Sequence, residues 1–381
     1  VIPCEAWDYD LPPEKQTIIS FWNLVCERSR LLRMAHGFEY LGTFMLVPLI
    51  GQTTDRLGRR PVIFLCVVAA LISGFISSVA YRFTIFVVAR ILVAASVHAL
   101  KVVTYVLLLE VTSTDKRELY CCLPHIGSVA AFVVARMLHG IFLDRQVVNL
   151  LTMLPMSFLV FAFYAVKESP RWLLSVNDIE SAEGVLLIVS EMNSLSSGNF
   201  EKQLSNVKPV RKRRPTFTFV QFLSILTLRK RTLVLAWAWL CVHMSVYTFV
   251  LMYSSSRSEP REPDINNVSI VSSVGAILGS YGLLKHYNRK AIFYLLMPLS
   301  SVLTVVSAAC SLVVEKISIA SALVIISSVL QATNVVLYVY TFEVFPTVLR
   351  VMGMSVTYFC GRLGAALAYW IFNLTSEIHP S

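Results

Sequence analysis

The sequence predicts an all-α integral membrane protein, and three observations support this fold class. Apolar residues make up 56% of the 381 residues, charged residues make up 15%, and the mean hydropathy is +0.67. A soluble domain usually carries about a quarter charged residues, so the composition points to the bilayer. Ten long apolar segments follow one another along the chain, and basic residues gather in alternate loops between them.

The apolar segments are the elements that we expect to span the membrane. A helix needs about 20 apolar residues to cross the hydrocarbon core, and within lipid a helix satisfies all of its own backbone hydrogen bonds. We therefore predict ten membrane helices. They lie at residues 31–50, 62–81, 84–110, 123–143, 147–166, 233–253, 265–284, 292–314, 317–340 and 352–373.

Basic residues predict how these helices are oriented. The loops after the odd-numbered segments hold twenty Lys or Arg residues, and the alternate loops hold five. Loops rich in Lys and Arg remain on the cytoplasmic side, so both termini are expected outside. The formal net charge of +10 is explained by these loops, and we expect no nucleic-acid partner.

The longest polar stretch, residues 167–231, separates the first five segments from the last five. It contains an expected amphipathic helix at residues 179–192 and a basic run at residues 208–214. The basic run could bind anionic lipid or could serve only as an orientation anchor in a solvated loop. In either case the stretch is interpreted as a linker between two halves.

The placement of the cysteines argues against a metal site, and the absence of known catalytic motifs argues against an enzyme. Six of the eight cysteines fall within or directly beside apolar segments without metal-ligand spacing, where cysteine acts as a small packing residue. Cys4 and Cys26 lie on the expected external segment and could form a disulfide. The sequence holds no Ser/His/Asp set and no phosphate-binding loop, so neither cofactor nor metal is expected.

The loop after the first segment carries the first specific motif. Two glycines, Gly51 and Gly58, permit a tight turn and close helix approach, and Asp55 can form a charge network with the arginines beside it. The loop reads Gly51-Gln52-Thr53-Thr54-Asp55-Arg56-Leu57-Gly58-Arg59-Arg60. This order resembles the signature of the major facilitator superfamily between its second and third helices. The resemblance implies a major facilitator fold with ten of its twelve helices, helices 2–11, present in this chain.

Further motifs narrow the resemblance to one family within the superfamily. They read Glu168-Ser169-Pro170-Arg171-Trp172-Leu173-Leu174, Thr341-Phe342-Glu343-Val344-Phe345-Pro346-Thr347-Val348-Leu349-Arg350, Trp7-Asp8-Tyr9-Asp10 and Trp22-Asn23-Leu24-Val25-Cys26. Together they resemble the solute carrier 22 family of organic cation and anion transporters. Sugar porters share the first two motifs but lack the cysteine-bearing external segment.

The resemblance implies a domain order. Family members have twelve helices and a large external domain between the first two, so the chain is expected to begin inside that domain and to stop after the eleventh helix. We expect a remnant of the external domain at residues 1–30 and an N-terminal helical half at residues 31–166. A cytoplasmic linker at 167–231, a C-terminal half at 232–373 and an external tail at 374–381 would follow.

The function implied by the resemblance is transport of a small organic ion by alternating access, in a multi-pass protein of the plasma membrane. Two halves would rock around a central site near the midplane. The resemblance also implies cytoplasmic gating residues. These are Asp55, Arg56, Gly58, Arg59, Arg60, Glu110, Arg117, Glu168, Arg171, Glu343 and Arg350. The corresponding loop of the second half, residues 285–290, lacks the Asp and the Gly-Arg-Arg order, so the second gating network is expected to be weaker.

Ionisable residues within the spans are functional candidates by default. Arg90, His98, Lys101 and Tyr105 fall within about 80° of one another on a helix and so share a face. Arg90 matches a family position that bridges to a neighbouring helix. Lys101 could face the cavity, snorkel or pair. Glu39, in the first segment, could bind a cation or neutralise a basic neighbour such as Lys101.

Arg362 in the last segment is the most informative of these residues, and it shares a stripe with Tyr358. In the resembling family the anion branch carries Arg at the matching position and the cation branch carries Asp. The second basic residue of the anion branch, however, aligns with Ile277. The sequence therefore favours an organic anion as substrate. An organic cation or carnitine-type substrate, or a non-transporting paralogue, is left open.

Aromatic residues complete the predicted site. Trp239 and Tyr247 match cavity positions of the family, and such rings can stack on an amphipathic organic guest. The expected substrate-binding residues are thus Arg362, Lys101, Tyr358, Trp239, Tyr247 and Glu39.

Overall fold

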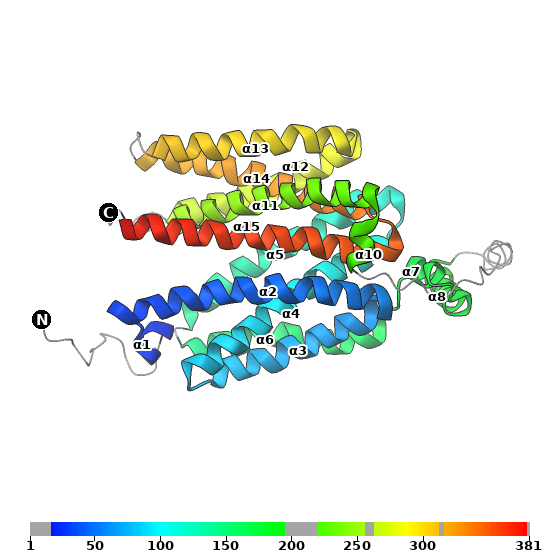
Figure 1. Ribbon diagram of the computed structural model, residues 1–381, viewed down its shortest axis with the longest axis horizontal. Coiled ribbons are helices and arrows are strands. Elements are labelled where there is room, and N and C mark those ends of the chain that lie inside the picture. Colours follow the sequence, from blue (N-terminus) through cyan, green and yellow to red (C-terminus); the bar gives the residue numbers. More distant parts are fainter. Residues whose placement is uncertain (1–16, 143, 195–218, 256–262, 312–315, 379–381) are drawn as a thin grey trace, which may run out of the picture.

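The structure is a computed structural model that describes residues 17–142, 144–194, 219–255, 263–311 and 316–378. Within these residues ten helices of 21 to 30 residues run roughly parallel in one bundle (Figure 1). At 1.5 Å per residue the shortest of them is about 31 Å long, which matches the thickness of the hydrocarbon core.

The long helices form two sets of five. The first set is α2 (Ser29–Leu57), α3 (Arg59–Val79), α4 (Phe83–Val111), α5 (Arg117–Ile141) and α6 (Arg145–Ala165). The second set is α11 (Leu226–Ser255), α12 (Pro263–His286), α13 (Arg289–Ser311), α14 (Lys316–Val344) and α15 (Arg350–Ile378). Each of the ten predicted spans therefore coincides with one long helix over its described residues, although α2 and α5 extend further toward their loops than hydropathy indicated.

Short elements connect the long ones. They are α1 (Ile18–Trp22), α7 (Pro170–Ser175), α8 (Ile179–Met192), α10 (Phe219–Ser224) and the 3-10 turns Cys26–Arg28, Thr114–Lys116 and Thr347–Leu349. The predicted amphipathic helix at 179–192 coincides with α8. The basic run at 208–214 and Cys4 lie outside the described residues, and Cys26 is an exposed free thiol.

The two sets meet along two seams, where α2 packs on α15 and α5 packs on α12. Element α1 and the end of α15 lie at one end of the bundle, and α7 and α8 lie beyond the opposite end (Figure 1). Below, this second end is called the latch end. The count of basic residues predicts that the latch end faces the cytoplasm.

The outer surface of the bundle is suited to lipid. Large apolar side chains stand exposed on it, including Leu65 (65%), Phe161 (70%) and Leu295 (66%). A soluble monomer rarely exposes apolar surface over so wide an area. Among the described helices, seven are long and apolar enough to cross a membrane: α3, α4, α5, α6, α11, α14 and α15.

The core lies between the two sets of helices. Its largest fully buried side chains include Trp239, Tyr338, Tyr358 and Phe342, together with the charged Arg59. Aromatic rings with polar tips and a buried arginine are unusual in a packed interior, because each polar group must find a partner there. These residues mark two places in the bundle, one near its middle and one at the latch end.

Candidate functional site

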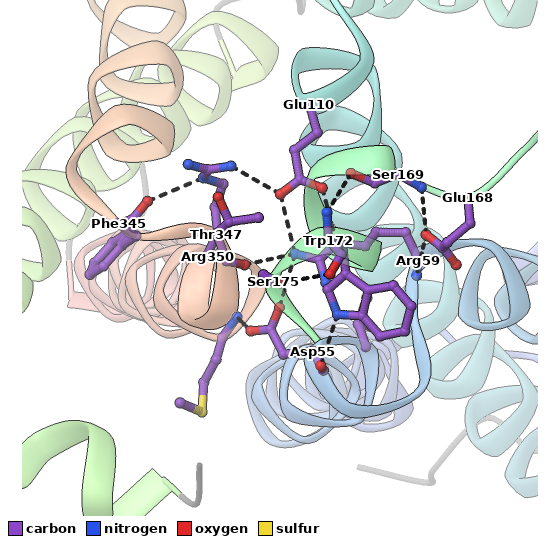
Figure 2. Close-up of polar contacts among 12 residues, drawn as sticks. Asp55, Arg59, Glu110, Glu168, Ser169, Trp172, Ser175, Phe345, Thr347 and Arg350 are labelled. Atoms are coloured by element: carbon purple, nitrogen blue, oxygen red, sulfur yellow. Dashed lines mark hydrogen bonds and ion pairs between the residues drawn. The ribbon is translucent and has the colours of Figure 1, made fainter. Parts of the chain in front are cut away.

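At the latch end a buried group of charges joins α2, α3 and α4. The guanidinium of Arg59 lies 3.2 Å from Asp55 and 3.2 Å from Glu110, and the side chains of Arg59 and Glu110 are fully buried. Figure 2 shows Arg59 between the two carboxylates. Because a buried charge is tolerated only when it is paired, this group holds the three helix ends together.

The same charges reach the second half of the bundle. Nη1 of Arg350, at the start of α15, donates to Oε1 of Glu110 at 3.0 Å, and Nη2 of Arg59 donates to the carbonyl of Thr347 at 3.0 Å. Oδ2 of Asp55 accepts the backbone N–H of Met352 at 2.8 Å. A carboxylate at a helix N-terminus is stabilised by the unpaired N–H groups there. We call Asp55, Arg59, Glu110 and Arg350 the first latch.

Glu168 supports the first latch from the segment before α7. Its two carboxylate oxygens accept the backbone N–H groups of Arg59 and Arg60 at 3.0 Å each, which caps the start of α3. The backbone of Gly58 has a φ of +106°, and a Cβ there would lie 2.5 Å from Oε2 of Glu168. Only glycine therefore fits between α2 and this carboxylate.

Arg60 and Trp172 fasten the neighbouring elements. Arg60 donates to the carbonyl of Phe163 at 3.1 Å and lies 4.3 Å over its ring. Nε1 of Trp172 donates to the carbonyl of Asp55 at 3.1 Å (Figure 2), which holds α7 against the end of α2. Arg60 thus binds α3 to α6 and does not reach the second half through these contacts.

A second latch lies beside the first, at the loop where the sequence predicts a weaker network. Arg289, at the start of α13, forms ion pairs with both Glu118 and Glu343, and Arg117 lies 3.5 Å from Glu343. The motif of residues 285–290 has lost its Asp, but Arg289 occupies the place that Arg59 holds in the first half. We call Arg117, Glu118, Arg289 and Glu343 the second latch. Its side chains are 11–25% exposed, whereas those of the first latch are at most 11% exposed.

Two predicted gating residues lie at the margin of these clusters. Arg56 is exposed in the last turn of α2. Arg171 is exposed on α7, where partial burial and then the positive charge of Arg117 lower the pKa of its guanidinium. Both side chains are thus available to solvent in this arrangement.

Near the middle of the bundle Arg362 occupies a cage of tyrosines. It is 6% exposed, donates a hydrogen bond to the hydroxyl of Tyr247, and lies 4.9 Å over the ring of Tyr40 and 5.2 Å over that of Tyr247. Helices α2, α11 and α15 therefore surround one guanidinium. Tyr40 was not singled out by the sequence, because a tyrosine on an apolar helix is ordinarily a packing residue.

A network of aromatic rings continues from Arg362 toward the latch end. Trp239 contacts Tyr358 (ring centroids 5.5 Å apart) and Tyr338 (4.7 Å), and its Nε1 donates to Oγ1 of Thr341 at 2.9 Å. The Tyr358 hydroxyl lies 2.6 Å from Nδ1 of His98 on α4. The structure thus brings together the predicted residues Arg362, Tyr358, Trp239 and Tyr247.

Lys101 joins this group from α4. Its Nζ lies 5.6 Å over the ring of Tyr338, within the interior of the bundle. Among the residues that the structure describes, no carboxylate lies within 4.0 Å of Lys101 or Arg362. Ile277, by contrast, is fully buried in the α5–α12 seam, where its carbonyl faces Cys122. Lys101 and Arg362 are thus two cations without a carboxylate partner in the described interior.

Glu39 has a different position from the rest of the predicted site. Its carboxylate accepts a hydrogen bond from Nε of Arg90 at 2.9 Å and lies 3.9 Å from His36. Arg90 therefore bridges α4 to α2, as its family position implied. Because Glu39 is engaged by Arg90 rather than Lys101, we leave it out of the substrate contacts proposed below.

The structure also adds residues that the sequence did not indicate. His243 on α11 and His125 on α5 are buried within the aromatic network, and His243 stacks on Trp239 at 5.1 Å. A lone histidine in an apolar segment is no more informative than any other packing residue, so only the contacts reveal them. Within the described part of the chain no group of three or more His, Cys, Asp or Glu residues could hold a metal ion.

The family comparisons agree with this arrangement. Residues 31–378 match the family model described as "Sugar (and other) transporter". Solute carrier family 22 member 7 from Sus scrofa is 27% identical over 380 residues, which cover 96% of this chain and 67% of the relative. The organic cation transporter protein of Drosophila melanogaster is 24% identical over 388 residues, covering 98% of this chain and 69% of the relative.

Solved structures show the same fold. The proton:xylose symporter XylE of the major facilitator superfamily superimposes with a TM-score of 0.68 at 17% identity, covering 92% of this chain and 80% of that chain. The chain thus spans about two thirds of the length of the two curated relatives and most of the solved bundle.

Proposed function

We propose that this chain, which belongs to the sugar (and other) transporter family as a solute carrier 22-type member of the major facilitator superfamily, carries small organic anions. The chain is a multi-pass membrane transporter and not an enzyme. The proposal covers the charge of the substrate, the residues that hold the substrate, and the plasma membrane as the location of the protein.

The charge balance around Arg362 supports an anion. Arg362 and Lys101 are both inside the bundle, and no described carboxylate lies within 4.0 Å of either. Two charges of the same sign repel each other strongly where the effective dielectric is low. A carboxylate or sulfonate bound between them would offset that repulsion, and a guanidinium can bind such a group through two parallel hydrogen bonds.

The tyrosine rings support the same conclusion. An organic cation would need open aromatic faces, yet Arg362 lies over Tyr40 and Tyr247, and Lys101 lies over Tyr338. The protein's own cations thus already occupy these faces. An organic cation at this site would have to displace a charged side chain and would be repelled by both cations.

Alternating access is the mechanism that the latches support. Ion pairs between the two sets of helices lie at the latch end, at Glu110–Arg350, Arg117–Glu343 and Glu118–Arg289. These pairs close the bundle on the side that we predict to be cytoplasmic. Opening would then require them to separate while the opposite end of the bundle closes over the anion.

Uptake measurements in cells expressing this protein test the proposal. We expect uptake of a radiolabelled aromatic sulfonate and no uptake of a tetraalkylammonium ion. Arg362→Asp should lower anion uptake at least about tenfold, because it exchanges attraction for repulsion at low dielectric, and Arg362→Lys should retain part of it. Surface biotinylation measures plasma-membrane location and normalises uptake. Cation uptake that survives Arg362→Asp, with no anion uptake in the wild type, contradicts the proposal.

A further inference from the structure

His243 lies near Arg362, and its two ring nitrogens form no hydrogen bond with the described residues. The residue is 8% exposed, and both of its ring nitrogens are buried without a hydrogen-bond partner among the described residues. The Nε atom of Arg362 is buried and unpartnered in the same way. Buried polar groups are normally satisfied, and each exception calls for an explanation such as a functional role.

Contacts on three sides fix the position of His243. Its ring stacks on Trp239 at 5.1 Å and packs edge-on against Tyr358 at 6.0 Å. On the third side it lies against the backbone of α15, where a Cβ on Gly361 would be 3.1 Å from the imidazole. Gly361 immediately precedes Arg362, so His243 lies against α15 next to the residue that carries the guanidinium.

The spacing on α11 supports this placement. Trp239, His243 and Tyr247 follow at intervals of four residues and so share one face of the helix. Tyr247 accepts a hydrogen bond from Arg362, and Trp239 contacts Tyr358 one turn earlier on α15. His243 therefore lies between the residue that holds the guanidinium and the residue that forms the aromatic wall.

We propose that His243 is a specificity-determining residue, and that the substrate is an organic anion with a planar heteroaromatic ring. This inference rests on the proposed function. The acid group of the substrate binds Arg362, and a ring N–H of His243 donates a hydrogen bond to a ring nitrogen of the substrate. A neutral imidazole carries one donor and one acceptor, so it recognises heteroaromatic rings but has no polar contact to offer a plain phenyl ring.

Further buried polar atoms without a described hydrogen-bond partner belong to the same aromatic network. The hydroxyl of Tyr105 and Nε2 of His125 are buried without a described hydrogen-bond partner. Their rings meet Tyr338 at 5.0 and 5.1 Å, and Tyr338 meets Trp239 at 4.7 Å. These residues thus combine flat aromatic faces with scattered polar atoms, which suits a ring that stacks and also forms hydrogen bonds at its edge.

A pair of isosteric monoanions tests the proposal. Pyridine-3-carboxylate and benzoate share size, shape and carboxylate, and differ in one ring nitrogen. We expect the wild type to take up pyridine-3-carboxylate with a kcat/KM about tenfold higher, because benzoate leaves the His243 donor unsatisfied. His243→Phe should abolish this ratio, and His243→Gln should retain part of it. His286→Phe, on an exposed histidine at the end of α12, is the matched control and should keep the wild-type ratio.

The ratio of kcat/KM for the two anions distinguishes a role of His243 in substrate recognition from a role in packing alone. A merely structural His243 would change uptake of both anions equally and leave their ratio intact, and that result would overturn the inference. Uptake of both anions at equal kcat/KM by the wild type would overturn it too, as would uptake of neither while other organic anions are carried. If no organic anion is carried at all, it is the proposed function that fails. Should His243→Phe fail to fold, the ratio measured with His243→Gln decides.

Discussion

Nη1 of Arg350 lies 3.0 Å from Oε1 of Glu110, and this contact ties the beginning of α15 to the end of α4. The second half repeats the arrangement with the roles exchanged, because Arg117 at the beginning of α5 lies 3.5 Å from Glu343 near the end of α14. The two contacts are thus related by the approximate two-fold symmetry of the two sets of helices. This symmetry organises the latch end although the sequence motif of the second half is degraded.

Glu110→Gln should destabilise the protein severely. The substitution removes a fully buried carboxylate that pairs with both Arg59 and Arg350. Breaking a buried ion pair by removing one partner typically costs about 3–5 kcal/mol. A thermal melt in detergent should show a clear fall in Tm. Glu180→Gln, at an exposed position in the first turn of α8, is the control, and an equal Tm for the two variants would refute the prediction.

Arg289→Gln should have a smaller and salt-dependent effect. Arg289 pairs with Glu118 and Glu343, but its side chain is 25% exposed. Partly exposed pairs contribute less than buried ones and are screened by salt. We expect the fall in Tm to be smaller than for Glu110→Gln and to shrink as the salt concentration rises. A fall as large as that of Glu110→Gln at every salt concentration would show that the second latch is as tightly held as the first.

Gly58→Ala should disturb the start of α3. Its backbone has a φ of +106° and its Cβ would lie 2.5 Å from the Glu168 carboxylate. Forcing a side chain into this region costs about 1–3 kcal/mol, and displacing Glu168 adds to that. Gly184→Ala in α8 is the matched control, because nothing lies within 4 Å of its Cβ position. In an exposed helix the change to Ala gains up to about 1 kcal/mol, so the two variants should shift Tm in opposite directions.

Glu39→Gln should weaken the fold without changing substrate affinity. The carboxylate pairs with Arg90 at 2.9 Å, so its loss leaves that arginine without this partner. We expect a lower Tm and an unchanged KM for organic anions. The double variant Glu39→Gln/Arg90→Met should recover part of the Tm, because it removes the uncompensated charge as well. A several-fold change in KM for Glu39→Gln would instead return Glu39 to the substrate site.

Much of the fold could be predicted from the sequence, because membrane spans depend on local composition. Hydropathy located all ten long helices, and the amphipathic pattern at 179–192 located α8. Two residues of the first latch, Asp55 and Arg59, were also predictable from the contiguous motif at 51–60, whereas Glu110 and Arg350 were named only through the family resemblance. Local signals of this kind do not depend on how the helices pack.

The central site was less accessible to sequence reasoning. Arg362, Lys101 and Trp239 were predicted because charge or family position singled them out, but Tyr40, His125 and His243 carry no local signal. Their importance comes from contacts among five different helices, α2, α5, α11, α14 and α15. Glu118 was missed for the same reason, since only the packing of α5 against the second half brings it to Arg289.

The latch pairs also bear on how easily this bundle can change shape. Glu110 has one cationic partner within its own set of helices, Arg59, and one across the seam, Arg350. Glu343 likewise has Arg289 within its own set of helices and Arg117 across the seam. When the two sets of helices separate, each carboxylate therefore loses the arginine across the seam and keeps the arginine of its own set. Neither carboxylate is then left as an unpaired charge in the low-dielectric interior. The energetic barrier to reorientation is kept low by this division of partners, although the closed arrangement remains well bonded.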